Sequence, residues 1–70
     1  MTNLEAANAR RAEAEAAEAA GDYAAAARDY TLAAEQLVKV WWQMHRDVNS
    51  PDAANMRRKA IEMIRKRDAA

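Results

Sequence analysis

Residues 20–35 read AGDYAAAARDYTLAAE, and this stretch contains the only glycine of the chain. A glycine just past a helical run adopts the left-handed conformation that ends a helix, and the Asp22 carboxylate can then cap the next helix. Tyr23 and Tyr30 are seven residues apart and therefore lie on one side of that second helix. The alanines between them let a neighbouring helix approach closely. We therefore expect two helices that meet at Gly21 and pack with the tyrosines in the seam between them.

A second break falls at residues 49–52, which read NSPD. Ser50 at the N-cap, Pro51 in the first turn and Asp52 behind it favour a helix start, because they satisfy or replace free N–H groups and complement the positive helix end. The predicted helices cover about residues 3–20, 22–47 and 51–68. Short connections place consecutive helices antiparallel. We expect one domain over residues 1–70 with an all-α fold, an antiparallel up-down-up three-helix bundle.

Each predicted helix has a different apolar face. On a helical wheel the first helix gathers small residues on one side, namely Ala9, Ala12, Ala16, Ala19 and Ala20. The second helix supplies most of the expected core, namely Tyr23, Ala26, Ala27, Tyr30, Ala33, Leu37, Val40, Trp41, Met44 and Val48. The third helix aligns Ala53, Met56, Ala60, Met63 and Ile64, with Ile61 beside them. Glu15 and Glu18 are expected to point away from the alanine face of the first helix.

The composition argues against several classes of function. The chain has no cysteine and a single histidine, so we expect no disulfide, no metal site and no cofactor. The motifs of phosphate-binding loops, serine hydrolases and zinc proteases do not occur, and we predict that the chain is not an enzyme on its own. It has neither a leader pattern nor an apolar stretch of the length that spans a bilayer. We therefore expect a cytoplasmic protein without membrane insertion.

The net charge is zero, but the charges are distributed unevenly. Residues 1–35 carry seven acidic and three basic side chains, whereas residues 36–70 carry four acidic and eight basic ones. Such an asymmetry indicates internal pairing or a partner that reads one sign of charge. Nucleic acid is not an expected partner, because the acidic half would repel phosphate and an overall positive charge is lacking. A homo-oligomer, in which the acidic half of one copy meets the basic half of another, stays open.

Some apolar residues lie outside the main stripe of the second helix. Val38 and Trp42 are one turn apart and lie about 100° around the helix from Leu37 and Trp41. The second helix is thus apolar on two adjacent faces in its C-terminal half. A central helix that touches both neighbours accounts for this pattern. The alternative is an exposed groove between the second and third helices, which would bind a partner's amphipathic helix or an extended segment.

Two longer patterns point to a known family. Residues 17–33 follow A-x-x-A-G-D-Y-x-x-A-x-x-x-Y-x-x-A, and residues 57–66 follow R-x-K-A-x-E-M-I-x-K. Together these patterns resemble the microtubule-interacting and trafficking (MIT) domain, whose members are three-helix bundles of about this length. Tetratricopeptide repeats share the first pattern, but a single repeat predicts only two helices.

The resemblance implies a peptide-binding adaptor. MIT domains dock short motifs from the tails of membrane-remodelling filament subunits of the ESCRT-III class. The motif binds as a helix between the second and third helices, or as an extended strand between the first and third. By position, Ile64 matches the family's groove leucine and Met63 the tyrosine before it. Glu62 matches the family's glutamate, and Lys66 matches its arginine.

One departure from the family changes the expected ligand. The family often has an acidic residue directly after the groove leucine, where Arg65 stands in this chain. Arg58 and Lys59 would add to a positive rim, so a motif with acidic flanks should bind better than the family's basic one. The predicted peptide-binding groove consists of Val38, Trp42, Arg58, Ile61, Ile64 and Arg65. The alternative is a free-standing or designed helical bundle without a native ligand, because alanine-rich helices with clean caps are typical of idealised sequences.

Overall fold

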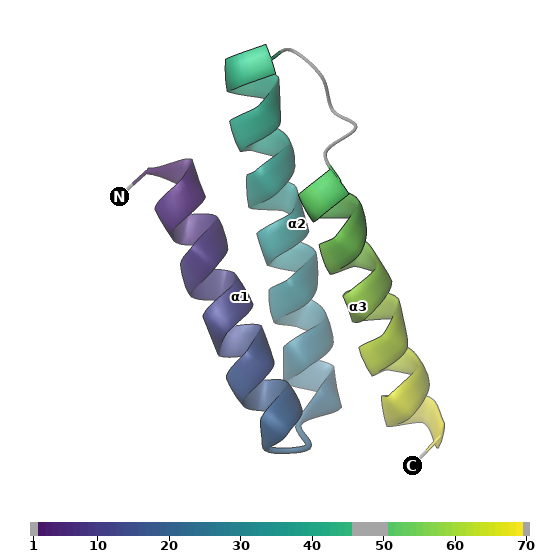
Figure 1. Cartoon of the computed structure of the whole chain (residues 1–70). Helices are drawn as coiled ribbons and strands as arrows, with labels where there is room; N and C mark the ends of the chain where they lie inside the picture. Colours follow the sequence, from purple (N-terminus) through teal and green to yellow (C-terminus); the bar gives the residue numbers. More distant parts are fainter. Residues whose placement is uncertain (1, 46–50, 70) are drawn as a thin grey trace.

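Three helices make up most of the described chain (Figure 1). The computed structural model describes residues 2–45 and 51–69, and the side chains at positions 3, 41 and 43–45 are outside this description. The helices are α1 (Asn3–Ala19), α2 (Tyr23–His45) and α3 (Pro51–Ala69). Successive helices run in opposite directions, which confirms the predicted all-α, up-down-up three-helix bundle.

The predicted helix boundaries agree with the observed ones to within one residue wherever both are described. The predicted end of the second helix at residue 47 and the Ser50 cap lie outside the described residues. The same holds for Val48 and for the side chains of Trp41 and Met44, which were expected in the core.

The turn between α1 and α2 is built as its glycine predicts. Gly21 has a φ of 80°, a left-handed conformation that glycine adopts at low cost. The Gly21 N–H donates to the Glu18 carbonyl at 3.0 Å and the Asp22 N–H donates to the Ala17 carbonyl at 2.9 Å, which together form a Schellman motif. The Asp22 carboxylate then accepts a hydrogen bond from the Ala25 N–H at 3.2 Å and caps α2.

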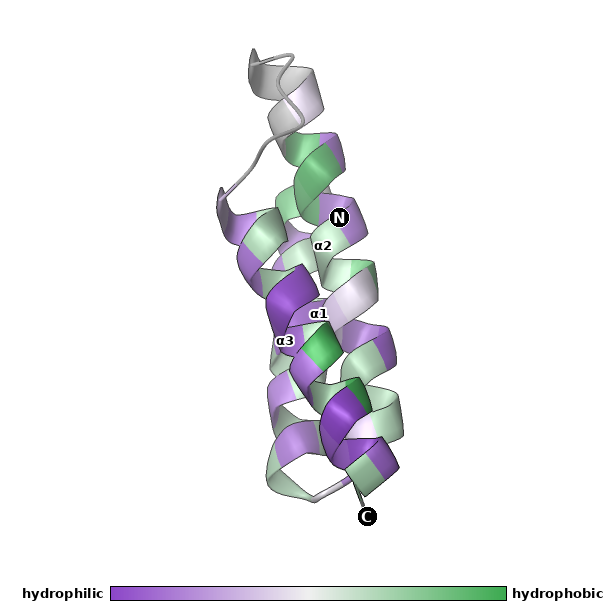
Figure 2. Cartoon of the chain, turned by 90° about the vertical axis from the view of Figure 1, so that its right-hand side faces the viewer, coloured by the Kyte–Doolittle hydropathy of each residue, from purple (hydrophilic) through white to green (hydrophobic). Residues whose placement is uncertain are grey.

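The bundle is flattened, with α2 in the middle. Both α1 and α3 pack along α2, and the three helices lie side by side in Figure 1 but overlap in the view turned by 90° (Figure 2). The backbone measures 40 × 22 × 12 Å, so its smallest dimension is close to the diameter of one helix. The central helix therefore contacts both neighbours, which accounts for the two adjacent apolar faces predicted for it. The seam between α2 and α3 lies at the surface.

The core is made of small residues around two large side chains. Tyr30 and Met63 are the largest side chains that are fully buried. The buried apolar residues are Ala7, Ala14, Ala26, Ala27, Tyr30, Ala33, Ala34, Leu37, Ala53, Met56, Ala60 and Met63. Tyr23 and Val40 of the predicted stripe are half-buried. Ile64 departs from the predicted stripe of α3, because 38% of its surface is exposed.

The predicted contact face of α1 is wrong. The residues expected at the contact are exposed, namely Ala9, Ala12, Ala16, Ala19 and Ala20. Ala7 and Ala14 are buried instead. Glu18, which was expected to point away, is half-buried and accepts a hydrogen bond of 2.7 Å from the Tyr30 hydroxyl. Alanines occur on every side of α1, so the apolar pattern does not mark its inner face.

Two lysines show how α3 is positioned along α2. Lys59 Nζ lies 5.8 Å from the centroid of the Tyr30 ring, and Lys66 Nζ lies 5.6 Å from that of Tyr23. Both distances fall within the range of cation–π attraction. The later lysine thus contacts the earlier tyrosine, and the earlier lysine contacts the later tyrosine, as expected for antiparallel helices. The C-terminal half of α3 therefore lies beside the N-terminal half of α2.

Candidate functional site

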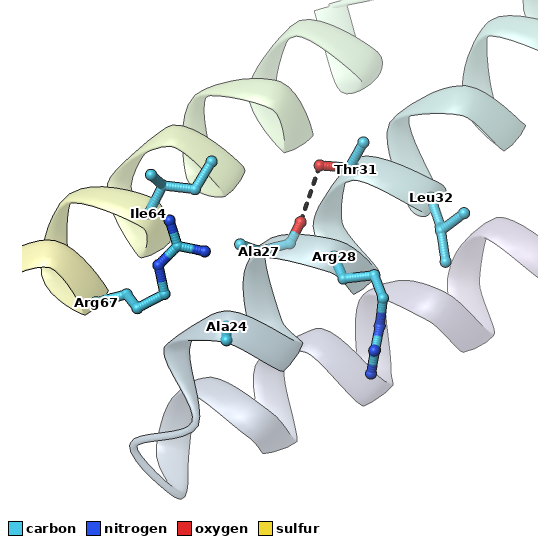
Figure 3. Close-up of a pocket in the computed structure, with 7 residues that line it drawn as sticks. All are labelled: Ala24, Ala27, Arg28, Thr31, Leu32, Ile64 and Arg67. Atoms are coloured by element: carbon cyan, nitrogen blue, oxygen red, sulfur yellow. Dashed lines mark hydrogen bonds between the residues drawn. The ribbon is translucent and has the colours of Figure 1, made fainter.

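An open groove lies between α2 and α3 and is the candidate site (Figure 3). Its volume is about 320 Å³, at the lower end of the range for ligand sites. The lining residues are Ala24, Ala27, Arg28, Thr31, Leu32, Ile64 and Arg67. The first five come from the N-terminal half of α2 and the last two from the C-terminal half of α3, so the register of the two helices creates the site.

The floor of the groove is formed by two small apolar residues of α2. Ala24 and Ala27 carry only a methyl group, which leaves room beside the Ile64 side chain. The Thr31 hydroxyl donates to the Ala27 carbonyl one turn earlier, at 2.9 Å (Figure 3). Its donor is therefore used within the helix. Apart from Arg28, the α2 side of the groove thus offers apolar contacts rather than free donors.

Two arginines border this apolar floor. Arg67 extends from α3 into the space between the helices, and Arg28 projects from α2 on the far side of Ala24 and Ala27 (Figure 3). No carboxylate is among the described residues that line the groove. Arg67 Nε lies 3.1 Å from Asp68 Oδ1, whereas Arg28 belongs to none of the ion pairs formed by the described residues. The groove therefore combines apolar contacts with a positive border.

Of the six predicted groove residues, Ile64 lines this groove. Arg58, Ile61 and Arg65 are exposed on α3 without lining it. Val38 is half-buried and packs against the core. Trp42 is 56% exposed.

The structure does not bring the α2 members of the predicted set close to Ile64. Ile64 falls between Lys59 and Lys66, and is therefore level with the part of α2 that includes Tyr23 and Tyr30. Val38 and Trp42 lie two and three turns beyond Tyr30, about 12 and 18 Å along the helix axis. The antiparallel register separates them from the C-terminal half of α3.

Sequence reasoning missed the α2 side of the groove and Arg67. The alanines between Tyr23 and Tyr30 were expected at a helix contact, and neither Arg28 nor Arg67 was among the predicted groove residues. The available signal was the helix order, because antiparallel pairing of the two helices places the end of α3 beside the start of α2. The helix order predicts where along α2 and α3 the site lies, but it does not identify the two arginines.

Tyr30 has a perturbed pKa but does not belong to the groove. Burial of the side chain, then the hydrogen bond to Glu18 and the neighbouring carboxylates of Glu18, Glu15 and Glu62, raise the pKa of its hydroxyl above the ordinary value. The side chain is fully buried, so a ligand in the groove does not reach it. Its role is to join α1 to α2.

The described part of the chain holds no cluster of three or more His, Asp or Glu side chains that could bind a metal ion. Among the described helices, none combines the length and the apolar character of a membrane span. What the groove offers is an apolar surface and two guanidinium groups. Such an arrangement can hold a ligand by burial and by charge.

Comparison of the chain with protein-family models, with curated proteins and with solved structures gives no match.

Proposed function

We propose that this domain is a peptide-binding adaptor that docks a short protein segment in the groove between α2 and α3. The observation that carries the proposal is Ile64. It is a large apolar side chain, 38% exposed, at the edge of an open groove whose α2 side includes the apolar residues Ala24, Ala27 and Leu32. A groove of this kind, between two helices, is a common seat for the apolar side chains of a partner helix or extended segment.

The resemblance of residues 17–33 and 57–66 to the MIT domain supports the same proposal, because it equates Ile64 with the family's groove leucine. On that resemblance the partner is a short motif in the tail of an ESCRT-III-class filament subunit, and the domain works in the cytoplasm as a targeting module for an effector. Full burial of one leucine-sized side chain contributes about 1.5–3 kcal/mol, so a groove this small gives weak binding unless the segment has further anchors.

Substitution of Ile64 tests the proposal. The probe is a fluorescent peptide of about 15 residues, long enough for a marginal helix, with leucines along one face. Binding measured by fluorescence anisotropy should be lost in Ile64→Asp, because a carboxylate then occupies the apolar edge of the groove. Circular dichroism should show largely unchanged helicity, because Ile64 is partly exposed.

Ile61→Asp is the matched control, since Ile61 stands one turn away on the same helix, is 51% exposed and does not line the groove. It should bind the peptide almost as the unaltered chain does. Unfolding by Ile64→Asp would show that Ile64 belongs to the core. Equal loss of binding in both variants would place the docking surface elsewhere on α3.

Self-association is the second candidate function, and the exposure of Trp42 favours it. A tryptophan that is 56% exposed is a common feature of interfaces. Light scattering at low and high salt would detect an oligomer and show whether opposite charges hold it together. Trp42→Ser should dissociate the oligomer if the surface around Trp42 forms the contact. A monomer at every concentration tested would exclude self-association.

A further inference from the structure

We infer that the groove selects acidic segments, in which an apolar side chain rests against Ile64 and carboxylates beside it bind Arg28 and Arg67. The inference rests on the proposed function and adds the charge of the partner and the two residues that bind its carboxylates. The sequence alone had assigned this charge preference to Arg58, Lys59 and Arg65, and the structure places none of these three among the lining residues.

The positions of the two arginines are the first reason. Arg28 is on α2 and Arg67 is on α3, so a segment that lies in the groove has a guanidinium group on each of the two helices. Arginine presents a planar set of N–H donors that matches a carboxylate. With no carboxylate among the described lining residues, a basic segment would meet only like charge there.

The donors of both arginines are available. The 3.1 Å contact with Asp68 uses Nε of Arg67 and leaves the terminal N–H groups for another acceptor. The side chains of Arg67 and Asp68 are both about half exposed, so this contact is screened by water and holds Arg67 weakly. Arg28 forms no ion pair with any described residue. A carboxylate that arrives with a ligand therefore has little to displace.

The apolar floor favours a peptide over an anionic lipid surface. Lipid headgroups are recognised by a cluster of four or more basic residues on one face, whereas this groove has two arginines separated by Ala24 and Ala27 (Figure 3). An apolar side chain between two carboxylates satisfies both kinds of contact. An acidic amphipathic segment of a protein partner has this pattern.

Three peptides that differ only in charge test the inference. Each has about 15 residues with leucines along one face, and the neighbouring positions hold glutamate, glutamine or lysine. The glutamate peptide should bind about two- to thirtyfold more tightly than the glutamine peptide, the range expected for two exposed ion pairs. The lysine peptide should bind most weakly, and the difference should shrink at high salt.

Charge reversal at the two arginines identifies them as the source of the preference. The double variant Arg28→Glu/Arg67→Glu should invert the order, so that the lysine peptide binds most tightly. The control is Arg58→Glu/Arg65→Glu, which changes the net charge by the same amount at exposed positions outside the groove. It should keep the original order, and circular dichroism of both variants should show the helicity of the unaltered chain.

The outcomes separate the two proposals. Equal binding of the three peptides would overturn the inference and leave the docking groove intact. If the control variant as well as Arg28→Glu/Arg67→Glu inverted the order of the three affinities, the inference would also be overturned, since the net charge of the domain would then explain the preference. Failure of all three peptides, including the neutral one, would instead contradict the proposed function. Binding to phosphatidylserine vesicles but not to the glutamate peptide would assign the arginines to a lipid surface and overturn the inference.

Discussion

At the scale of single residues, Tyr30 of α2 joins α1 through its hydroxyl and contacts a lysine of α3 with its ring. Its hydroxyl donates to Glu18 Oε1 on α1 at 2.7 Å, and its ring lies under Lys59 Nζ of α3 at 5.8 Å. A phenylalanine could fill the same space but could not reach the Glu18 carboxylate. Tyr23 offers a natural comparison, because its ring has the same relation to Lys66 while its hydroxyl has no hydrogen bond to a described residue.

Tyr30→Phe should lower the free energy of unfolding by about 1–2 kcal/mol, toward the lower end of the range for a hydrogen bond to a charged group, because Glu18 is only half-buried. Tyr23→Phe should change it by less than about 0.5 kcal/mol, because it removes no hydrogen bond to the described protein. Urea denaturation at neutral pH measures both. The opposite order would show that the hydroxyl of Tyr30 is not what holds α1 to α2.

The same contact predicts a pH dependence. Burial and the hydrogen bond to Glu18 raise the pKa of Tyr30 in the folded chain, whereas a tyrosine in the unfolded chain has a pKa of about 10. Below about pH 10 both states keep the proton. As the pH rises further, the unfolded state loses its proton first, so the stability that Tyr30 contributes falls by up to about 1.4 kcal/mol per pH unit.

Denaturation of the unaltered chain and of Tyr30→Phe at a series of pH values isolates this effect, because the lysines titrate in both. The difference in stability between the two chains should be constant near neutral pH and should shrink in alkali. A constant difference up to about pH 11 would mean that the pKa of Tyr30 does not change on folding.

At the scale of the helices, α1 shows what alanine-rich sequence leaves undecided. A helix with a methyl group on every side can present several faces to its neighbour at similar cost. Polar contacts join the buried face of α1 to α2, since the Tyr30 hydroxyl donates to Glu18 and Arg10 Nη1 lies 3.9 Å from Asp29 Oδ1 on α2. These contacts depend on side chains of two helices, and for this reason the apolar pattern of α1 alone predicts the wrong face.

Two leucine substitutions distinguish the faces of α1. Ala14 is fully buried, so Ala14→Leu should push α1 away from α2 and destabilise the fold by about 1–3 kcal/mol. Ala12 is exposed and belongs to the face predicted from sequence, and Ala12→Leu should be nearly neutral. Thermal unfolding followed by circular dichroism compares them. If Ala12→Leu were the more damaging change, the face predicted from sequence would be the contact.

The turn between α1 and α2 and most of the described core of α2 and α3 are predictable, because their signals are local. Gly21 and Asp22 end one helix and cap the next through bonds within a few residues. Met56 and Met63 are buried as their seven-residue spacing predicts. The groove has no local signal in the sequence, since its floor belongs to one helix and its edge to another. Likeness to a family motif predicts Ile64 at a groove, but no pattern within either helix relates Arg28 to Arg67.

At the scale of the whole molecule, the flattened bundle explains why a groove is exposed at all. With α1 and α3 on either side of α2, the outer surface of the α2–α3 seam is not covered by a further element of the described chain. Hydrophilic residues predominate along α3 and are interrupted by hydrophobic ones (Figure 2). The most basic helix of the molecule therefore borders the groove, which is the physical basis for expecting an acidic partner.

The most direct test of peptide docking is a methyl NMR titration, because the chain has two isoleucines, Ile61 and Ile64. Isoleucine δ1-methyl labelling gives one resonance in the groove and one beside it. On addition of the glutamate-flanked leucine peptide, the Ile64 resonance should shift saturably and further than that of Ile61. A peptide that binds by anisotropy without moving the Ile64 resonance, or that moves only Ile61, would contradict docking in the α2–α3 groove.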